Sequence, residues 1–170
     1  EMIYMASMEG FVKYNTQSDG VNYIKNNRNI SAGESGYLGI RKHDDNLYLI
    51  GLKRGLTCYS LNDGEFSSIG AFKSDRILWI EKFKNKLFIV KADYGLKVYD
   101  VNTNTIESIV AQKSDPTSIS SNTVRTISID SNNILWIGTN EAGVSYSHLA
   151  SNTLKVYKGK INQLLTQSVR

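Results

Sequence analysis

Short hydrophobic runs alternate with polar turns throughout the chain, and one pattern of runs and turns occurs four times. The fullest copy, at residues 134–149, reads ILWIGTNEAGVSYSHL: an aromatic flanked by aliphatics, a polar stretch, a glycine and a second apolar run. Weaker copies begin at Ile3, Leu47 and Leu87. A period near 44 residues, built from short strands, is typical of β-propeller blades. The leading aromatics are spaced 44, 40 and 48 residues apart and are Tyr4, Tyr48, Phe88 and Trp136.

The pattern predicts an all-β fold, a β-propeller of four-stranded antiparallel blades with about four blades in this chain. The third repeat begins with an inner strand at Ile77–Phe83. The fourth begins with one at Val124–Ile129 and should end with a strand at residues 153–157. The first repeat opens on a second strand and lacks an inner one. The predicted blades occupy approximately residues 1–31, 37–72, 76–112 and 122–159.

The C-terminal tail, residues 160–170, has two interpretations. Its last seven residues, LLTQSVR, align with ISSNTVR at 119–125, which leads into the inner strand of the fourth repeat. The tail therefore either begins the next blade or closes the first blade into a ring. A closed ring leaves no exposed sheet edge, whereas a piece of a larger propeller exposes two. Because four blades is the lower end of the known range, we favour the larger propeller.

Charge and hydropathy argue against several kinds of partner. Lys and Arg total 20 and Asp and Glu total 16, and the net charge of +4 is dispersed along the chain. Nucleic-acid binders usually present a clustered basic face, so we expect no nucleic-acid partner. No run approaches the ~18 apolar residues of a membrane span. Membrane contact is expected only through segments absent from this chain.

Few residues are suited to metal or nucleophilic chemistry. Cys58 is the only cysteine, which excludes an intrachain disulfide, and we expect it to act as a small buried hydrophobe. His43 and His148 are the only histidines. His43 lies in the turn KHDDN, where we expect it to be solvated. Because a metal site needs three or four convergent ligands, we predict no metal and no cofactor.

The fourth repeat carries a specific motif over residues 119–157, ISSNTVRTISIDSNNILWIGTNEAGVSYSHLASNTLKVY. Its distinctive positions are Ser121, Asn122, Val124, Ile127, Ile129, Asp130, residues 135–139, Gly143, Val144 and Tyr157. With these residues the segment resembles the two-component regulator propeller repeat, as in periplasmic sensor domains of bacterial hybrid histidine kinases. It departs from that pattern at Ala142, which replaces the first of two paired glycines.

The resemblance implies an extracytoplasmic sensor of a two-component signalling protein. It implies a periplasmic location as part of an inner-membrane protein, a homodimer in the full-length sensor, and an oligosaccharide or other small-molecule ligand. The chain shows no phospho-accepting His context and no Gly-rich nucleotide loop, so we do not expect it to be an enzyme. Because similar propellers also precede diguanylate cyclases, the output module stays open between a kinase and a cyclase.

Candidate ligand-binding residues lie on the turns between second and third strands, because these turns open on one face of a propeller. Glu9, Asp93 and Glu141 occupy this turn in the first, third and fourth repeats. Lys53 and Arg54 occupy it in the second. In the competing interpretation, the acidic residues are ordinary turn residues that favour solubility.

Aromatic residues complete the candidate set. Tyr94 lies in a face loop beside Gly95, and Trp79 lies on an inner strand next to the predicted channel. Trp136 and Tyr48, at second-strand positions, are instead expected to pack between neighbouring blades. The predicted ligand-binding residues are therefore Arg54, Asp93, Tyr94, Glu141 and Trp79.

Two other functions compete with the sensor. A protein-interaction propeller scaffold of the WD-repeat kind would carry Trp-Asp or Gly-His marks in each blade, and this chain has neither. A propeller enzyme, such as a lyase or a glycosidase, would need a convergent set of His, Tyr or carboxylate side chains. The two poorly placed histidines argue against a lyase.

Overall fold

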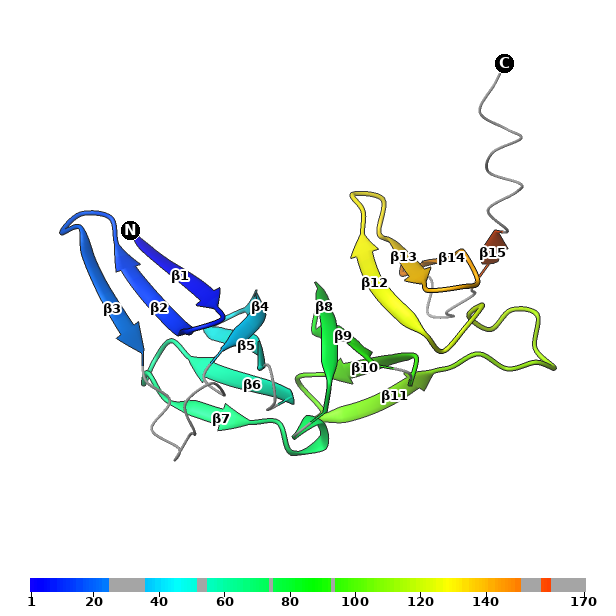
Figure 1. Cartoon of the computed structure of the whole chain (residues 1–170), viewed down its shortest axis with the longest axis horizontal. Helices are drawn as coiled ribbons and strands as arrows, with labels where there is room; N and C mark the ends of the chain where they lie inside the picture. Colours follow the sequence, from blue (N-terminus) through cyan, green and yellow to red (C-terminus); the bar gives the residue numbers. More distant parts are fainter. Residues whose placement is uncertain (25–35, 52–54, 74, 93, 151–156, 160–170) are drawn as a thin grey trace, which may run out of the picture. The chain divides into compact units, whose positions relative to one another are not determined.

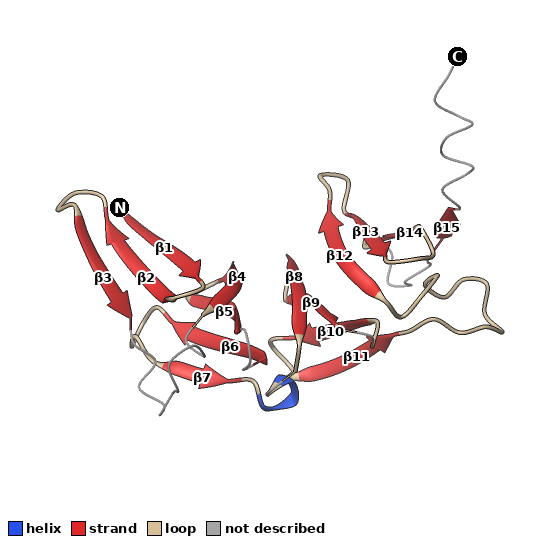
Figure 2. Cartoon of the chain, viewed as in Figure 1, coloured by secondary structure: helices blue, strands red, loops and turns tan. Residues whose placement is uncertain are grey.

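The computed structural model describes residues 1–24, 36–51, 55–73, 75–92, 94–150 and 157–159. The described residues form two compact units, Glu1–Ile77 and Leu78–Arg170, and each is considered by itself. The strands are antiparallel throughout and follow chain order within each sheet (Figures 1 and 2). The tail at residues 160–170 lies outside the described residues, as do Arg54 and Asp93.

Unit 1 contains two blades. In blade 1, β1 (Met2–Ser7), β2 (Gly10–Asn15) and β3 (Gly20–Ile24) form a three-stranded sheet among the described residues. This agrees with the predicted lack of an inner strand. Blade 2 and the short helix after it consist of β4 (Tyr37–His43), β5 (Asn46–Gly51), β6 (Gly55–Ser60), β7 (Phe66–Ser68) and the 3-10 helix η1 (Gly70–Phe72).

Unit 2 contains two four-stranded blades. The inner strands, β8 (Ile77–Phe83) and β12 (Val124–Ile129), have the bounds that the sequence predicts. The fourth strand of blade 4, predicted at residues 153–157, is described only from Tyr157 onward, because residues 151–156 lie outside the described residues. Blade 3 consists of β8 (Ile77–Phe83), β9 (Lys86–Lys91), β10 (Leu96–Asp100) and β11 (Thr105–Ile109). Blade 4 consists of β12 (Val124–Ile129), β13 (Ile134–Thr139), β14 (Val144–His148) and β15 (Tyr157–Gly159).

Each blade has two distinct faces, because successive side chains of a strand point to opposite sides of the sheet. We name one side the aromatic face. On it the leading aromatic lies opposite a residue of the third strand: Tyr4 opposite Lys13, Tyr48 opposite Cys58, Phe88 opposite Val98 and Trp136 opposite Tyr146. The other side is the aliphatic face, which carries the residues that flank the aromatic: Ile3 and Met5, Leu47 and Leu49, Leu87 and Ile89, and Leu135 and Ile137.

In unit 1, the aromatic face of blade 1 packs against the aliphatic face of blade 2. Phe11 is almost fully buried at the centre of this core. Its ring stacks on Tyr4, with 5.8 Å between centroids, and meets Tyr59 edge-on at 5.0 Å. Leu47 and Leu49 belong to the same cluster. Such offset and edge-to-face pairs add to apolar burial, so the two blades share one core.

Unit 2 repeats this arrangement with Phe88 as the one fully buried aromatic residue of the described cluster. Phe88 and Val98 of blade 3 are buried in one cluster with Ile127, Leu135 and Ile137 of blade 4. All five side chains are at most 5% exposed. At roughly 1.5–3 kcal/mol for each fully buried side chain, this interface is a principal source of the unit's stability.

Two residues differ from the sequence-based expectation. Trp136, expected between blades, is 40% exposed, whereas Tyr48 is only 7% exposed. Trp136 lies on the aromatic face of blade 4, where its ring is 5.3 Å from that of Tyr146, and it is absent from the described core cluster that buries Phe88. His43, expected in solvent, is only 7% exposed. It ends β4 with its side chain turned inward, and its Nδ1 lies 3.0 Å from a carboxylate oxygen of Asp44.

Asn122 joins blade 3 to blade 4. Its side-chain oxygen accepts a hydrogen bond from the backbone N–H of Ala111, just after β11, at 2.7 Å. Its backbone carbonyl accepts one from the N–H of Gly95, in the turn between β9 and β10, at 2.9 Å. Gly95 has φ +74°, and a Cβ at that position would lie 2.6 Å from the carbonyl oxygen of Ile109. Asn122 thus joins two neighbouring segments at one end of blade 3 to the start of blade 4.

Asp130 organises the hairpin turn between β12 and β13. One carboxylate oxygen accepts hydrogen bonds from the backbone N–H groups of Asn132 and Ile134, and the other accepts one from the Trp136 indole at 3.0 Å. The Trp136 indole and then the Ile134 N–H lower the pKa of the Asp130 carboxyl, because these bonds favour the ionised form. The same residue therefore fixes the turn and orients the exposed tryptophan.

Gly95→Ala should destabilise unit 2 by about 2 kcal/mol or more, because the new methyl group meets backbone and the positive φ disfavours alanine. The measurement is the urea midpoint followed by far-ultraviolet circular dichroism. Gly70→Ala is the matched control, because a Cβ at Gly70 meets nothing within 4 Å, and it should change stability by under about 1 kcal/mol. Equal effects of the two substitutions would contradict this account of the junction.

Acid should weaken the protein partly through Asp130. A carboxyl whose pKa is lower in the folded state stabilises the fold above its unfolded-state pKa, and this contribution disappears as pH falls below about 4 through the folded-state value. Asp130→Asn should therefore flatten the decline of the urea midpoint between neutral and acidic pH. Asn132→Ala, in the same turn, keeps the carboxylate and should retain the wild-type slope. A wild-type slope in Asp130→Asn would refute the assignment.

Candidate functional site

The described members of the predicted site lie on three separate elements of unit 2. Trp79, on β8, is 40% exposed, and its indole N–H donates to Glu81 at 3.1 Å. Tyr94, in the turn between β9 and β10, is 62% exposed, and the Lys91 ammonium lies 4.6 Å from the centre of its ring. Glu141 is exposed in the turn between β13 and β14.

The structure does not join these three residues into one site. Within the described ranges, Trp79, Tyr94 and Glu141 make no hydrogen bond or ring contact with one another. Tyr94 and Glu141 do occupy the corresponding turn in consecutive blades, as the repeat predicts. Tyr94 and Glu141 therefore remain candidates for contact with a ligand at the surface, and not for an enclosed binding site.

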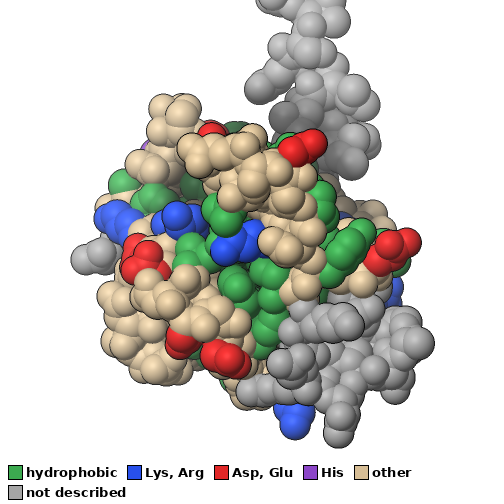
Figure 3. Space-filling model, turned by 90° about the vertical axis from the view of Figure 1, so that its left-hand side faces the viewer, with side chains coloured by type: hydrophobic (Ala, Val, Ile, Leu, Met, Phe, Trp, Pro, Cys, Tyr) green, Lys and Arg blue, Asp and Glu red, His purple; other side chains and the backbone are tan. Residues whose placement is uncertain are grey.

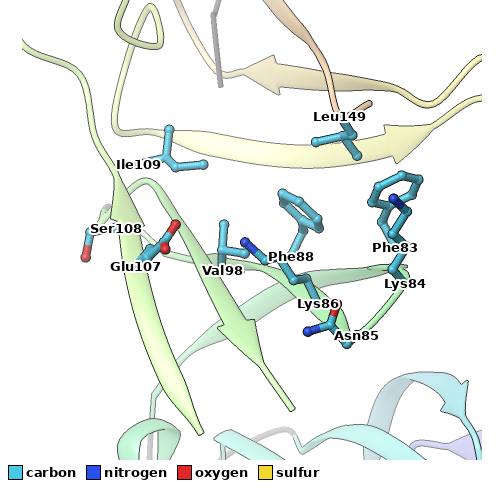
Figure 4. A pocket seen from close by; sticks show the side chains of 10 residues that line it. All are labelled: Phe83, Lys84, Asn85, Lys86, Phe88, Val98, Glu107, Ser108, Ile109 and Leu149. Atoms are coloured by element: carbon cyan, nitrogen blue, oxygen red, sulfur yellow. The ribbon is translucent and has the colours of Figure 1, made fainter. Parts of the chain in front are cut away.

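A pocket of about 540 Å³ lies elsewhere in unit 2, between blades 3 and 4 (Figure 4). This volume is within the range of small-molecule sites. Its lining is apolar in the middle and polar at the rim. The apolar members are Phe83, Phe88, Val98, Ile109 and Leu149, and the polar members are Lys84, Asn85, Lys86, Glu107 and Ser108.

The register of blade 3 brings the pocket residues together. Val98 lies directly opposite Phe88 on one side and Glu107 on the other, so the three side chains share the aromatic face of the blade. The turn between β8 and β9 supplies Lys84 and Asn85. Leu149, just after β14, closes the pocket from blade 4, opposite the phenylalanines (Figure 4).

Hydrogen bonds and charge fix part of the pocket's rim. The Asn85 amide donates to Asp100 at 2.6 Å, and the Lys97 ammonium donates to the Ser108 hydroxyl at 2.6 Å. The Lys84 ammonium lies 5.3 Å from the centre of the Phe83 ring. The rim of the pocket also carries two opposite charges, the Lys86 ammonium and the Glu107 carboxylate, around the apolar residues at its centre. Such a lining suits a small polar molecule that also presents an apolar face.

The repeat does not predict this pocket, because its lining combines a hairpin turn, strands β8 to β11 of blade 3 and Leu149 of blade 4. A usable signal was the run Lys84-Asn85-Lys86, which places two cations and an amide immediately before the buried strand β9. The contribution of Leu149 from blade 4 is a tertiary contact that a single repeat does not reveal.

Other chemistry has little support in the described part of the chain. Among the described residues, no group of three or more His, Cys, Asp or Glu side chains is arranged to hold a metal ion. Burial raises the pKa of the Cys58 thiol, which disfavours the nucleophilic thiolate. The Cys58 thiol donates a hydrogen bond to the side-chain oxygen of Asn46, with 3.4 Å between Sγ and Oδ1. None of the helices in the described ranges has the length and apolarity to span a membrane.

Comparisons with known proteins agree with the repeat. Residues 118–141 match the family model described as two component regulator propeller. The chain is similar to the extracellular domain of BT4673 from B. thetaiotaomicron, described both as a one-component and as a hybrid two-component system. The TM-score is 0.71 at 20% identity, over 86% of this chain and 20% of that one. A comparison with curated protein sequences finds no match.

Two further solved structures show the same fold. The extracellular domain of BT3049 from B. thetaiotaomicron, described as a hybrid two-component system, gives a TM-score of 0.67 at 19% identity, over 92% of this chain and 22% of that one. The N-terminal domain of Nup159 gives 0.65 at 12% identity, over 95% of this chain and 42% of that one. The present chain thus spans only a part of each of these proteins.

The matched segment contains Asn122, the residue that joins blades 3 and 4, and the Asp130 turn with Trp136. At these identities the solved structures establish the fold alone, and the family is indicated by the matched segment. This chain is an all-β propeller segment whose fourth blade carries the two-component regulator propeller repeat.

Proposed function

We propose that this chain is a ligand-recognition segment of the extracytoplasmic sensor of a two-component signalling protein. The observation that carries the proposal is the two-component regulator repeat at residues 118–141, in a fold shared with extracellular domains of such systems. The chain itself would be non-enzymatic and periplasmic. A kinase or another output module elsewhere in the protein would pass on the signal.

The ligand in this proposal is a carbohydrate or a similar small polar molecule. The pocket between blades 3 and 4 supports this class, because its apolar floor can pack against a sugar ring while the rim offers hydrogen-bond donors and acceptors. In this proposal the Glu107 carboxylate accepts hydrogen bonds from the ligand, the Lys86 ammonium donates them, and Asn85 is a neutral partner. The exposed turn residues Tyr94 and Glu141, with Trp79, form the competing location.

A signal could leave this pocket through the blade interface. Phe88 and Val98 line the pocket and also belong to the core shared by blades 3 and 4. A ligand that binds one spacing of the two blades better than another would shift the population of blade arrangements. The contacts that recognise the ligand would then also transmit the signal between the two blades.

The test is a binding screen of this chain against neutral, amino and acidic oligosaccharides, with calorimetry and the thermal midpoint as readouts. A ligand of the pocket should lose at least about tenfold in affinity in Glu107→Gln or Lys86→Met, because a charge-assisted hydrogen bond to the ligand would be lost. Both substitutions lie at the rim and should leave circular dichroism unchanged.

Matched variants separate the two locations. Glu65→Gln, in a turn of unit 1, should leave binding unchanged, and a ligand of the face turns should instead respond to Tyr94→Ala and Glu141→Gln. Binding that responds to none of the variants in unit 2 would exclude both locations. If no oligosaccharide raises the thermal midpoint, the carbohydrate class is wrong.

A further inference from the structure

The pocket between blades 3 and 4 has charged groups of opposite sign on opposite sides. Its described lining includes two lysines and one glutamate. Lys84 and Lys86 flank Asn85 at the β8–β9 turn, whereas Glu107 lies on the outer strand β11. Figure 4 shows the apolar side chains of the pocket between these two places. The pocket therefore has a cationic end at the hairpin turn and an anionic group across the apolar centre.

The acidic residue opposite Lys86 is engaged in its own turn. Asp100 faces Lys86 in the strand register. One of its carboxylate oxygens accepts hydrogen bonds from the backbone N–H groups of Asn102 and Thr103, and the other accepts one from the Asn85 amide at 2.6 Å. Asp100 is also absent from the described lining of the pocket. The charge that faces the pocket at the hairpin end is therefore that of the two ammonium groups.

Both ammonium groups have hydrogen-bond donors to offer a ligand. The Lys84 ammonium lies 5.3 Å from the centre of the Phe83 ring, and a cation held over a ring keeps donors on the sides away from it. Within the described ranges, the Lys86 ammonium forms no ion pair and no hydrogen bond with another side chain. Ammonium donors beside an apolar surface form their strongest hydrogen bonds with anionic oxygens.

The separation of the charges restricts the kind of ligand. Neighbouring strands lie about 4.8 Å apart, so β9 and β11 are about 10 Å apart across β10. A free amino acid carries its two charges on adjacent groups and would not reach both sides. A saccharide would: its anionic group meets the lysines, an apolar ring face packs on Phe88 and Val98, and its hydroxyls donate to the Glu107 carboxylate.

The exposed apolar surface of blade 1 is a different kind of surface. Ile3 is 42%, Met5 43% and Tyr23 66% exposed. Figure 3 shows hydrophobic side chains in the middle of this side of the molecule, with Lys, Arg, Asp and Glu side chains around them. Side chains this exposed do not enclose a small molecule, whereas ligand pockets bury most of a ligand's surface. The charges that select a small ligand are therefore those of the pocket.

We propose that the pocket between blades 3 and 4 selects acidic saccharides, sugars that carry a carboxylate or a sulfate. Lys84 and Lys86 bind the anionic group, and Glu107 accepts hydrogen bonds from the sugar hydroxyls. The two lysines favour an anionic sugar over a neutral one, and Glu107 favours a sugar over a simple inorganic anion. This inference rests on the proposed function, because it names the ligand class of the same pocket.

The test compares each acidic sugar with its own neutral form. The probes are oligosaccharides of galacturonate and of glucuronate and their methyl esters, which keep the ring and the linkage but lose the charge. A sulfated neutral oligosaccharide, with its unsulfated form, separates sulfate from carboxylate. In calorimetry on the whole chain, at least one acidic sugar should bind at least about tenfold more tightly than its neutral form. The difference should shrink as salt is raised, because salt screens charges at a pocket rim.

Variants of the hairpin assign the preference to the two lysines. Lys84→Met and Lys86→Met should each reduce the difference between acid and ester, and the double variant should bind the two forms nearly equally. Lys82→Met is the matched control, because Lys82 is an exposed residue of the same hairpin outside the described lining. It should keep the full preference. Circular dichroism and the thermal midpoint report whether each variant folds, and Lys86→Gln replaces a Lys86→Met protein that does not.

The outcomes separate this inference from the proposed function. Equal binding of the acidic and neutral forms would overturn the inference while the pocket remained a carbohydrate site. A preference for acids that survives in the double variant would overturn it as well. A preference for the sulfated sugar that the double variant loses supports it, with sulfate as the anionic group. If no saccharide of either kind binds, the proposed function fails and the inference fails with it.

Discussion

The packing of one blade's aromatic face against the next blade's aliphatic face is the interaction on which each unit depends. A single antiparallel sheet of this size cannot bury both of its faces, so each blade is stable only with a neighbour. Phe11 with Tyr59 in unit 1, and Phe88 with Leu135 in unit 2, carry this contact. Asn122 then links one end of blade 3 to the start of blade 4, because it accepts hydrogen bonds from the backbone N–H groups of Gly95 and Ala111.

The candidate pocket is a consequence of the same packing. Two blades in contact along their centres leave a gap toward one end, where the β8–β9 turn and the outer strand β11 supply polar side chains around Phe88. A site built in this way needs no specialised catalytic group. It fits a protein whose role is to recognise a molecule and to report its presence through the spacing of rigid elements.

Much of the fold follows from the sequence, because strand period and turn chemistry are local. The bounds of β8 and β12, the missing inner strand of blade 1 and the glycine turn at Gly95 could all be predicted from the repeat. The exposure of Trp136 could not, since the repeat predicts which face a side chain occupies but not whether a neighbour is present. The inward turn of His43 escaped prediction for a similar reason: its burial depends on tertiary contacts that the turn composition does not reveal.

The candidate site was harder to predict than the fold. The face turns at Tyr94 and Glu141 follow from repeat alignment, yet the structure gives these residues no shared contact. The pocket also depends on Leu149 of blade 4, which lies opposite the phenylalanines of blade 3. A contact between two blades leaves no signature in a single run of sequence.

The most direct test of the central claim is hydrogen exchange at single-residue resolution in the intact chain. If shared interblade cores stabilise the units, the amides of β9 and β10 in blade 3 should open together with those of β12 and β13 in blade 4, because the two blades share one buried cluster. Independent opening of blades 3 and 4 would contradict the account.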